Sequence, residues 1–159
     1  MNNAHLHLII NHFPVLGSLF SLGLLMLAYL KRSGDIEFTA YSSLLLTGVL
    51  AMATFFTGEP AEQVVEHEPG VTESVIHPHE VAAKAAMIAA VSAGLLSGFA
   101  LWTVMKQGKT VSGPVRMGVG AVALISTLSM ANTARLGGEI RHTEIRDGAA
   151  IPAEHADKD

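Results

Sequence analysis

The sequence contains no cysteine. That absence excludes thiolate metal sites, iron–sulfur clusters and disulfide bridges. It also excludes a covalently attached c-type haem, whose attachment needs a Cys-x-x-Cys-His motif. Histidine and carboxylate side chains remain as candidate ligands, and the chain has eight histidines and 14 acidic residues. If the protein binds a metal or a haem, we therefore expect imidazole or carboxylate ligation.

Charged residues are also scarce, at 15% of the chain, where a soluble domain usually has about a quarter. The deficit is concentrated in runs that contain no Asp, Glu, Lys or Arg: residues 13–30, 39–57, 85–105 and 117–134. Each run is close to the roughly 20 apolar residues that a helix needs to cross a bilayer core. Because lipid leaves backbone groups without partners outside a helix, the sequence predicts an all-α integral membrane protein. Its expected architecture is a four-helix transmembrane bundle with up-down-up-down order.

A soluble four-helix bundle is the alternative fold. Surface helices of soluble proteins carry a polar face, and the four charge-free runs lack one. A cleavable signal peptide is not expected either, because residues 1–12 lack the positively charged start of such a segment. The membrane bundle is therefore the favoured interpretation, with its first helix retained.

The remaining chain forms short links, an acidic segment and a charged tail. We expect residues 59–80, "EPAEQVVEHEPGVTESVIHPHE", to be an acidic extramembrane segment between the second and third spans. We predict one transmembrane domain over residues 1–146 and a flexible tail over 147–159. The formal net charge of −4 makes nucleic acid a poor partner.

Basic residues predict the orientation of the bundle. Four spans place both termini and residues 58–84 on one side of the membrane, here termed the histidine side. The links 31–38 and 106–116 lie on the opposite side, here termed the link side. The link side has only two acidic residues, Asp35 and Glu37, and half of the ten Lys and Arg residues: Lys31, Arg32, Lys106, Lys109 and Arg116. Lys and Arg in short loops favour the cytoplasm, so we predict a multi-pass protein of the bacterial inner membrane with both termini in the periplasm.

The histidines all fall on one side of the predicted bundle: His5, His7, His12, His67, His77, His79, His142 and His155. Three of them, His12, His79 and His142, lie at the ends of the first, third and fourth spans. Those ends come together in a compact bundle. Ionisable groups at the membrane are costly and point to a functional site, so this side is where we expect the chemistry.

Binding of b-type haem is the first chemistry that fits. Haem iron takes neutral imidazoles from facing helices, and the propionates need cations. We predict His12, His79, His142 and His7 as candidate ligands. Candidate cations for the propionates are Lys84, Arg135 and Arg141. The implied function is electron transfer, as a protein or as a subunit of a complex, because no nucleophile–base pair indicates a stand-alone enzyme.

A non-haem metal site is the second chemistry. Glu139 and His142 form a Glu-x-x-His pair, and Glu59 and Glu62 place two carboxylates on one helical face. Ferritin-like di-iron bundles combine such elements on facing helices, and mixed imidazole and carboxylate ligands suit Fe, Mn, Zn or Cu. The alternative ligand set for a mono- or dinuclear site is therefore His12, His79, His142, Glu59, Glu62 and Glu139.

A cofactor-free role is the third interpretation. Glu59 would then pair with Arg135, and the histidines would cap helix ends and extend toward the interface. In that case the protein is an accessory subunit of a larger membrane complex.

Proline marks the predicted start of the first helix. The helix begins either near Asn3 or only at Pro14, because proline suits the first turn of a helix and breaks its interior. If the helix begins early, Pro14 frees the carbonyl of Ile10. The sequence leaves both starts open.

The other helix ends are marked by Gly and Pro as well. "TGEP" at 57–60 predicts the end of the second helix, with a short amphipathic stretch at 61–65 after it. "HPHE" at 77–80 predicts the start of the third helix, with Glu80 in its first turn. The pair Gly137-Gly138 predicts the end of the fourth helix.

Four stretches together resemble a known family: "HLHLIINHFPVLG" at the start, "TGEPAE" after the second span, "HPHE" before the third and "LGGEIRH" after the fourth. It is a family of small, four-span bacterial membrane proteins of unknown function. Its members show a His-x-x-x-x-His-Phe-Pro-like start of the first helix and a Gly-Gly-x-Leu/Ile end of the last, with a nearby histidine. The matching positions are His7, His12, Pro14, Gly137, Gly138 and His142, and more loosely His79.

The resemblance covers residues 5 to about 145 and implies the four-span architecture. Some relatives are joined to c-type cytochrome domains, which implies a redox setting. The expected partners are the lipid bilayer and a periplasmic c-type cytochrome or a larger respiratory-type complex, and an oligomer is also compatible. Where relatives often read Leu-Val-Tyr after the glycines, this chain has Glu139, Ile140 and Arg141. The resemblance therefore supports the four-span architecture more strongly than it supports any ligand geometry at the end of the fourth helix.

Overall fold

The computed structural model describes residues 2–108 and 111–146, so the predicted tail over 147–159 lies outside the described residues. Within these residues every element is helical. The long helices are α2 His12–Lys31, α3 Gly34–Phe56, α5 Glu73–Gln107 and α6 Gly113–Arg141. The short elements are α1 Asn3–Ile10, α4 Gly58–Val65 and the 3-10 turn η1 Thr143–Ile145. The prediction of an all-helical chain is confirmed.

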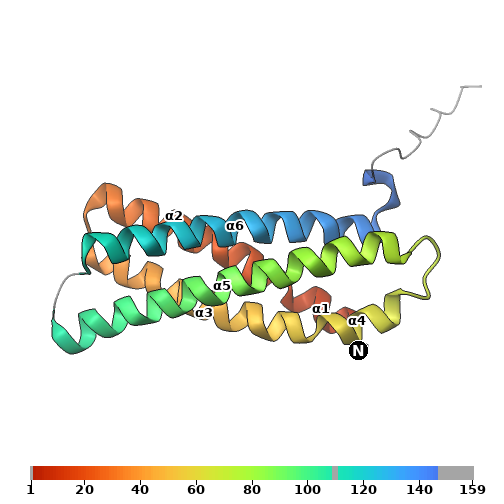
Figure 1. The fold of residues 1–159 in the computed structure, drawn as a ribbon, viewed down its shortest axis with the longest axis horizontal. Coiled ribbons are helices and arrows are strands. Elements are labelled where there is room, and N and C mark those ends of the chain that lie inside the picture. Colours follow the sequence, from red (N-terminus) through yellow and green to blue (C-terminus); the bar gives the residue numbers. More distant parts are fainter. Residues whose placement is uncertain (1, 109–110, 147–159) are drawn as a thin grey trace, which may run out of the picture.

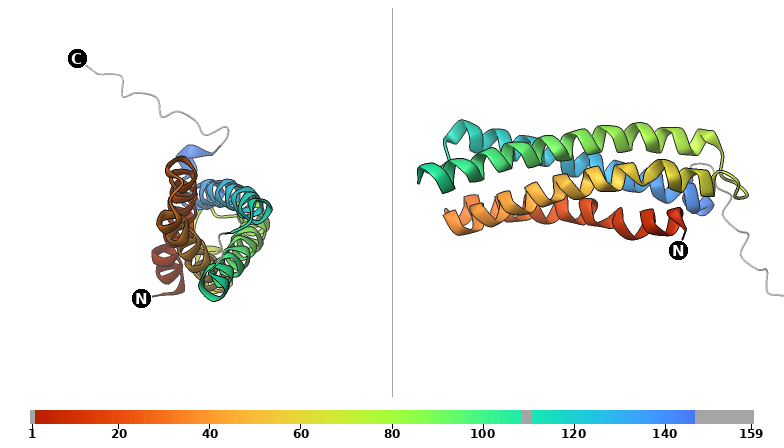
Figure 2. Two further views of the ribbon diagram at one scale, coloured as in Figure 1. Left: turned by 90° about the vertical axis from the view of Figure 1, so that its left-hand side faces the viewer. Right: turned by 90° about the horizontal axis from the view of Figure 1, so that it is seen from below.

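The four long helices form one bundle in which successive helices run in opposite directions (Figure 1). Seen along the bundle axis they surround a common centre (Figure 2), and the pairs in contact are α2 with α3, α3 with α5, α5 with α6 and α6 with α2. Four segments are long and apolar enough to cross a membrane: Asn3–Lys31, Gly34–Val65, Glu73–Lys106 and Gly113–Arg141. The chain therefore has the four helical segments that the charge-free runs predict.

The first segment is two helices with a break at Asn11. The side chain of Asn2 caps α1 by accepting a hydrogen bond from the His5 amide at 2.9 Å. Pro14 lies in the first turn of α2, where its missing N–H is tolerated. The hydroxyl of Thr54 on α3 donates to the freed Ile10 carbonyl at 3.3 Å. The early start at Asn3 is therefore confirmed, whereas α2 begins at His12, two residues before the alternative start at Pro14.

The second segment is broken in the same way at Thr57, between α3 and α4. The break confirms the helix end predicted at "TGEP", and α4 contains the predicted amphipathic stretch at 61–65. Helix α4 packs mainly on α1 (Figure 1). These two short helices make a small layer at the histidine side of the bundle.

Two predicted helix ends are wrong. Helix α5 begins at Glu73 and contains Pro78, because a proline so close to a helix start removes only one early backbone hydrogen bond. Glu73, and not Glu80, is therefore the acidic residue of the first turn. Helix α6 continues through Gly137-Gly138 to Arg141, since neither glycine has the positive φ that would end the helix.

Small residues allow α3 and α5 to approach closely. A Cβ atom on Gly48 would lie 2.9 Å from the carbonyl oxygen of Ala90 and 3.4 Å from Cα of Gly94. Such contacts between small residues are typical of membrane helix pairs. The core has two parts. The histidine-side core consists of Ala51, Ala86, Ala90 and Met130. The link-side core consists of Leu25, Ala40, Tyr41, Leu44, Ala93, Ala100, Leu101, Val111, Val119 and Ala123.

A partly buried ion pair closes the link side. Arg116 of α6 donates to both carboxylate oxygens of Glu37 on α3, at 2.7 Å each. Tyr41 donates to the same carboxylate at 2.5 Å. Tyr29 of α2 donates to the Arg116 carbonyl at 2.8 Å. The cluster therefore connects three of the long helices at the end where the sequence places its basic links.

Candidate functional site

Two histidines come together at the histidine side of the bundle. His7 lies on α1 and His79 near the start of α5, and both are half-buried. The break at Asn11 gives α1 its own direction, and the early start of α5 extends that helix past the bundle core. These two features of the fold place both imidazoles at the histidine side, His7 against Thr57 and His79 against Thr133.

The hydrogen bonds of His7 determine which ring nitrogen carries its proton. Nδ1 of His7 lies 2.8 Å from the hydroxyl oxygen of Thr57. That hydroxyl already donates its hydrogen to the Thr54 carbonyl at 2.7 Å, so it accepts from the imidazole. Neutral His7 therefore carries its proton on Nδ1 and has a lone pair on Nε2.

His79 has the same arrangement. Its Nδ1 lies 3.1 Å from the carbonyl oxygen of Thr133 on α6, which can only accept. Nδ1 of His79 is therefore the donor, and Nε2 carries the lone pair. Metal-ligating histidines are usually held in this way, with one ring N–H bonded to a carbonyl or other acceptor and the second nitrogen available.

Gly137 of α6 lies against the ring of His79. A Cβ atom at position 137 would lie 3.0 Å from Cε1 and 3.2 Å from Nδ1 of His79. A side chain at this position would displace the imidazole from the Thr133 carbonyl. Gly137, predicted to mark a helix end, thus makes room for the His79 ring.

The other predicted histidine ligands lie elsewhere on this side. His12 is exposed, and its Nδ1 lies 2.7 Å from the Leu8 carbonyl oxygen. It borders an apolar groove of about 460 Å³ between α2 and α3. His142 is also exposed, with Nδ1 2.8 Å from a carboxylate oxygen of Glu144. Neither imidazole joins the group formed by His7 and His79.

The cations predicted to bind haem propionates are either exposed or, in the case of Arg135, paired with the predicted metal ligand Glu139. Arg135 forms an ion pair with Glu139 of its own helix, so the expected pairing of Arg135 with Glu59 is wrong. The two partners are four residues apart on α6, a spacing that brings side chains together on one helix face. Lys84 and Arg141 are exposed. Both belong to the same side of the bundle as His7 and His79.

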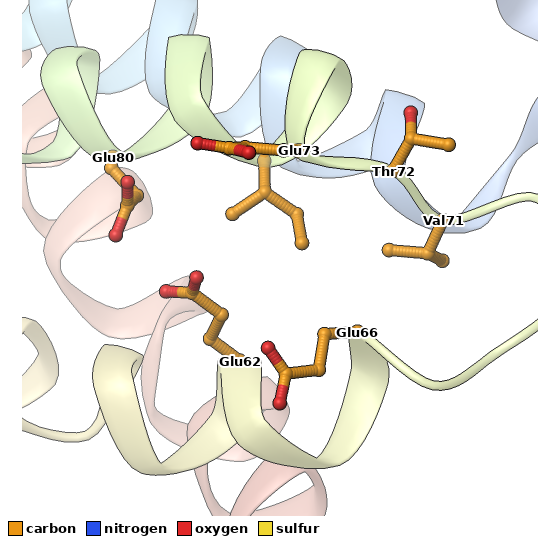
Figure 3. A pocket seen from close by; sticks show the side chains of 7 residues that line it. Glu62, Glu66, Val71, Thr72, Glu73 and Glu80 are labelled. Atoms are coloured by element: carbon orange, nitrogen blue, oxygen red, sulfur yellow. The ribbon is translucent and has the colours of Figure 1, made fainter.

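A cavity of about 200 Å³ lies between α4 and the start of α5. Its lining is acidic and consists of Glu62, Glu66, Val71, Thr72, Glu73, Ile76 and Glu80. Glu62 and Glu80 face each other across it (Figure 3). Two carboxylates in this position repel each other unless they share a proton or a cation.

The described residues do not bring three or more His, Asp or Glu side chains into a group that could hold a metal ion. The predicted non-haem ligands are accordingly spread out. Glu59 and Glu62 lie on α4, Glu139 pairs with Arg135, and His142 contacts Glu144. Among the predicted ligands within the described residues, His7 and His79 are the two whose ring nitrogens are best arranged to bind a metal or haem iron.

His7 and His79 are candidate ligands from the sequence alone, but the groups that orient them are not predictable from it. Thr57 and Thr133 are common residues in apolar helices, and a backbone carbonyl has no sequence signature. The preference for His12 arose because it is next to Pro14 at the start of a predicted span. A scan against protein-family models and searches of curated proteins and of solved structures each found no match. The resemblance stated above therefore stays a prediction.

Proposed function

We propose that this protein is a membrane-embedded electron-transfer protein, or the redox subunit of a larger complex, that binds b-type haem through His7 and His79. The observation that carries the proposal is a pair of half-buried imidazoles at the histidine side, His7 of α1 and His79 of α5, each with Nδ1 bonded and a lone pair on Nε2. Haem iron is held by two such nitrogens in many membrane cytochromes. The haem supplies one-electron redox chemistry when bound.

The number of ligands favours haem over a non-haem metal. A haem iron needs only two axial ligands from the protein, whereas non-haem sites use three or four protein donors. A group of three donors is not found in the described residues. The exposed cations Lys84 and Arg141 on the same side are candidates to neutralise the propionates.

This chain's own residues would act as positioning groups. Thr57 and the Thr133 carbonyl hold the two rings and fix the tautomer, which raises the basicity of each Nε2. Gly137 keeps α6 close to His79 without a side chain between them. Together these contacts keep both imidazoles in one orientation before a ligand binds, which lowers the entropy cost of binding.

We further propose that the histidine side faces the periplasm of a bacterial inner membrane. The short links of the link side hold five Lys and Arg residues against only two acidic residues, which supports this orientation. A redox centre at the periplasmic end exchanges electrons with a periplasmic partner, for which a c-type cytochrome or a respiratory-type complex is the expected class.

A non-haem transition metal is the second candidate, and one observation favours it. Glu62 and Glu80 face each other, and Glu80 follows His79 directly in α5. Carboxylate and imidazole ligands from α4 and α5 suit Fe, Mn or Zn. Elemental analysis of the purified protein, together with its absorption spectrum, distinguishes the two candidates. A non-haem site should give a stoichiometric metal content without the absorption bands of a porphyrin.

The test of the haem proposal is an absorption spectrum of the full chain purified from membranes with haem supplied. We expect a Soret band and a pyridine haemochrome of b type. His7→Ala and His79→Ala should each abolish or strongly shift the Soret band. His5→Ala, a change of an exposed histidine on the same helix, is the matched control and should retain the spectrum.

Two outcomes would overturn the proposal. Absence of the Soret band in the parent protein, together with less than stoichiometric Fe, Mn, Zn or Cu, would leave the cofactor-free accessory role. A normal spectrum in His7→Ala and His79→Ala would show that other residues, such as His12 or His142, ligate the iron.

A further inference from the structure

The C-terminal cap of α2 carries a side chain where glycine is the ordinary residue. Of the described residues other than glycine, only Arg32 has a positive φ, with φ 51° and ψ 39° at the C-cap of α2. L residues rarely adopt this left-handed conformation because their Cβ atom crowds the following carbonyl oxygen, whereas glycine adopts it freely. A side chain retained in an unfavourable backbone conformation points to a role beyond the local fold.

Helix α5 ends at the same side of the bundle with the same cap, but with glycine. Its C-cap is Gly108, with φ 58° and ψ 20°, and both caps donate their backbone N–H to the carbonyl four residues earlier. Each helix also has a lysine in its last turn, Lys31 in α2 and Lys106 in α5, which interacts favourably with the helix dipole. The cap and the dipole interaction are therefore both provided without the Arg32 side chain.

Arg32 lies just outside the level at which aromatic side chains mark the membrane boundary. Tyr29 of α2 and Trp102 of α5 are exposed at the link side, and tyrosine and tryptophan are enriched at the level of the lipid headgroups. Arg32 follows Tyr29 by three residues, which is about 4.5 Å at the helical rise of about 1.5 Å per residue. Arg32 and Lys31, both exposed, therefore lie at the level of the lipid phosphates.

The charge at the tip between α2 and α3 is positive. Lys31 and Arg32 are consecutive, and the next acids along the chain are Asp35 and Glu37 in the first turn of α3. Glu37 is bound by Arg116, so its charge is already offset. The ion pairs of the described chain do not include one between Asp35 and either cation of the tip. Two cations against one such acid leave a net positive charge that attracts an external anion.

We propose that Lys31 and Arg32 form a binding site for the phosphate of an anionic phospholipid at the link side. A guanidinium presents a planar fork of donors that fits two phosphate oxygens, and an ammonium adds a compact charge beside it. Basic residues next to a membrane span attract anionic lipids, whereas a zwitterionic headgroup carries a cation of its own that competes for the phosphate. Apolar surface for the acyl chains is provided by Met26, Leu27 and Leu30, which are exposed just before the tip.

This lipid site is independent of haem binding. The tip between α2 and α3 lies at the opposite end of the bundle from α1, which carries His7 (Figure 1). The site also concerns the link side whichever compartment that side faces. Its failure would therefore leave the proposed redox function untouched.

Native mass spectrometry of the full chain, released from a neutral detergent, counts bound lipids and gives their apparent Kd. We expect phosphatidylglycerol to bind more tightly than phosphatidylcholine with the same acyl chains. Arg32→Gly should weaken the binding of phosphatidylglycerol about fivefold, the effect of one cation at the membrane surface, and Lys31→Gln should have a similar effect. Lys106→Gln, which removes the corresponding lysine of α5, is the matched control and should leave the affinity nearly unchanged. Equal affinity for the two lipids, or an equal loss in Lys106→Gln, would overturn the site at the tip.

A second measurement separates lipid binding from the stability of the fold. Because glycine relieves the left-handed conformation, Arg32→Gly should keep or raise the unfolding midpoint in detergent without added lipid. The increase in midpoint on addition of phosphatidylglycerol should be smaller in this variant than in the parent protein. A lower midpoint without lipid would show that Arg32 serves the fold and would overturn the proposal.

Inorganic phosphate distinguishes a lipid site from a general phosphate site. At the same concentration as phosphatidylglycerol it should not displace the bound lipid, because it has no acyl chains to lie along α2. Displacement of the lipid by inorganic phosphate would overturn the assignment to phospholipid.

Discussion

At the scale of single residues, the link side depends on one carboxylate. Glu37 accepts hydrogen bonds from Arg116 and Tyr41, and its side chain is 12% exposed against 39% for Arg116. Glu37→Ala would leave a partly buried guanidinium without its partner. We expect a loss of roughly 2–3 kcal/mol, below the roughly 3–5 kcal/mol typical of a fully buried pair. Detergent unfolding followed through Trp102, the only tryptophan, measures this loss.

The control for this prediction is Asp35→Ala, which removes an exposed acid in the same first turn of α3. It should change stability by less than about 0.5 kcal/mol. Equal losses in both variants would show that the effect is general to acids at this helix start and would contradict a specific role of the Glu37 ion pair.

A second residue-scale prediction concerns pH. The backbone amide of Glu144 donates a hydrogen bond to its own carboxylate, and His142 donates another, so the pKa of Glu144 lies below its usual value. A lowered pKa favours the ordered turn η1 above the usual carboxyl range, and this contribution is lost as pH falls through the lowered pKa. An NMR titration of the Glu144 carboxyl carbon should show this, and His142→Ala should move the pKa back toward its usual value.

At the scale of helices, a glycine is important for stability where two helix backbones lie close together. Gly48 on α3 touches the α5 backbone, whereas a Cβ atom on Gly23 of α2 would meet nothing within 4 Å. Gly48→Ala should destabilise the bundle by about 1–3 kcal/mol through overpacking. Gly23→Ala should be neutral or slightly stabilising because alanine favours helix. The two unfolding midpoints make the comparison, and equal midpoints would refute the close approach of α3 and α5.

The breaks at Asn11 and Thr57 act at the same scale. Each separates a membrane-length helix from a short helix at the histidine side, and the hydrogen bond from Thr54 to the Ile10 carbonyl joins the two breaks. A continuous first helix would carry His7 in a different direction. The position of His7 beside His79 is therefore a property of the helix breaks as much as of the histidines.

At the scale of the whole molecule, the orientation in the membrane can be tested directly. Because the chain has no cysteine, single-cysteine variants give an unambiguous labelling pattern. Thr72→Cys on the histidine side should react with a membrane-impermeant maleimide in intact cells with a permeable outer membrane. Ser112→Cys on the link side should react only after the inner membrane is opened. The opposite pattern would reverse the proposed orientation.

The sequence alone predicted an all-helical molecule with four apolar helices long enough to cross a membrane, and the structure has them. Charge-free runs of membrane length leave helix as the only state that satisfies the backbone in lipid, and the absence of cysteine limits the ligand chemistry. The runs also place the histidines on one side, since each span reverses the chain direction. These conclusions depend only on composition along the chain, which is why they could be predicted without coordinates.

Only the tertiary structure decided which histidines meet. The choice of His7 over His12 depends on a break at Asn11, on the early start of α5 and on partners such as the Thr133 carbonyl, which any residue could supply. The continuation of α6 through Gly137 depends on packing against His79 and not on glycine's local preference. Contacts between distant segments are set by helix direction and close packing, and no single stretch of sequence encodes them.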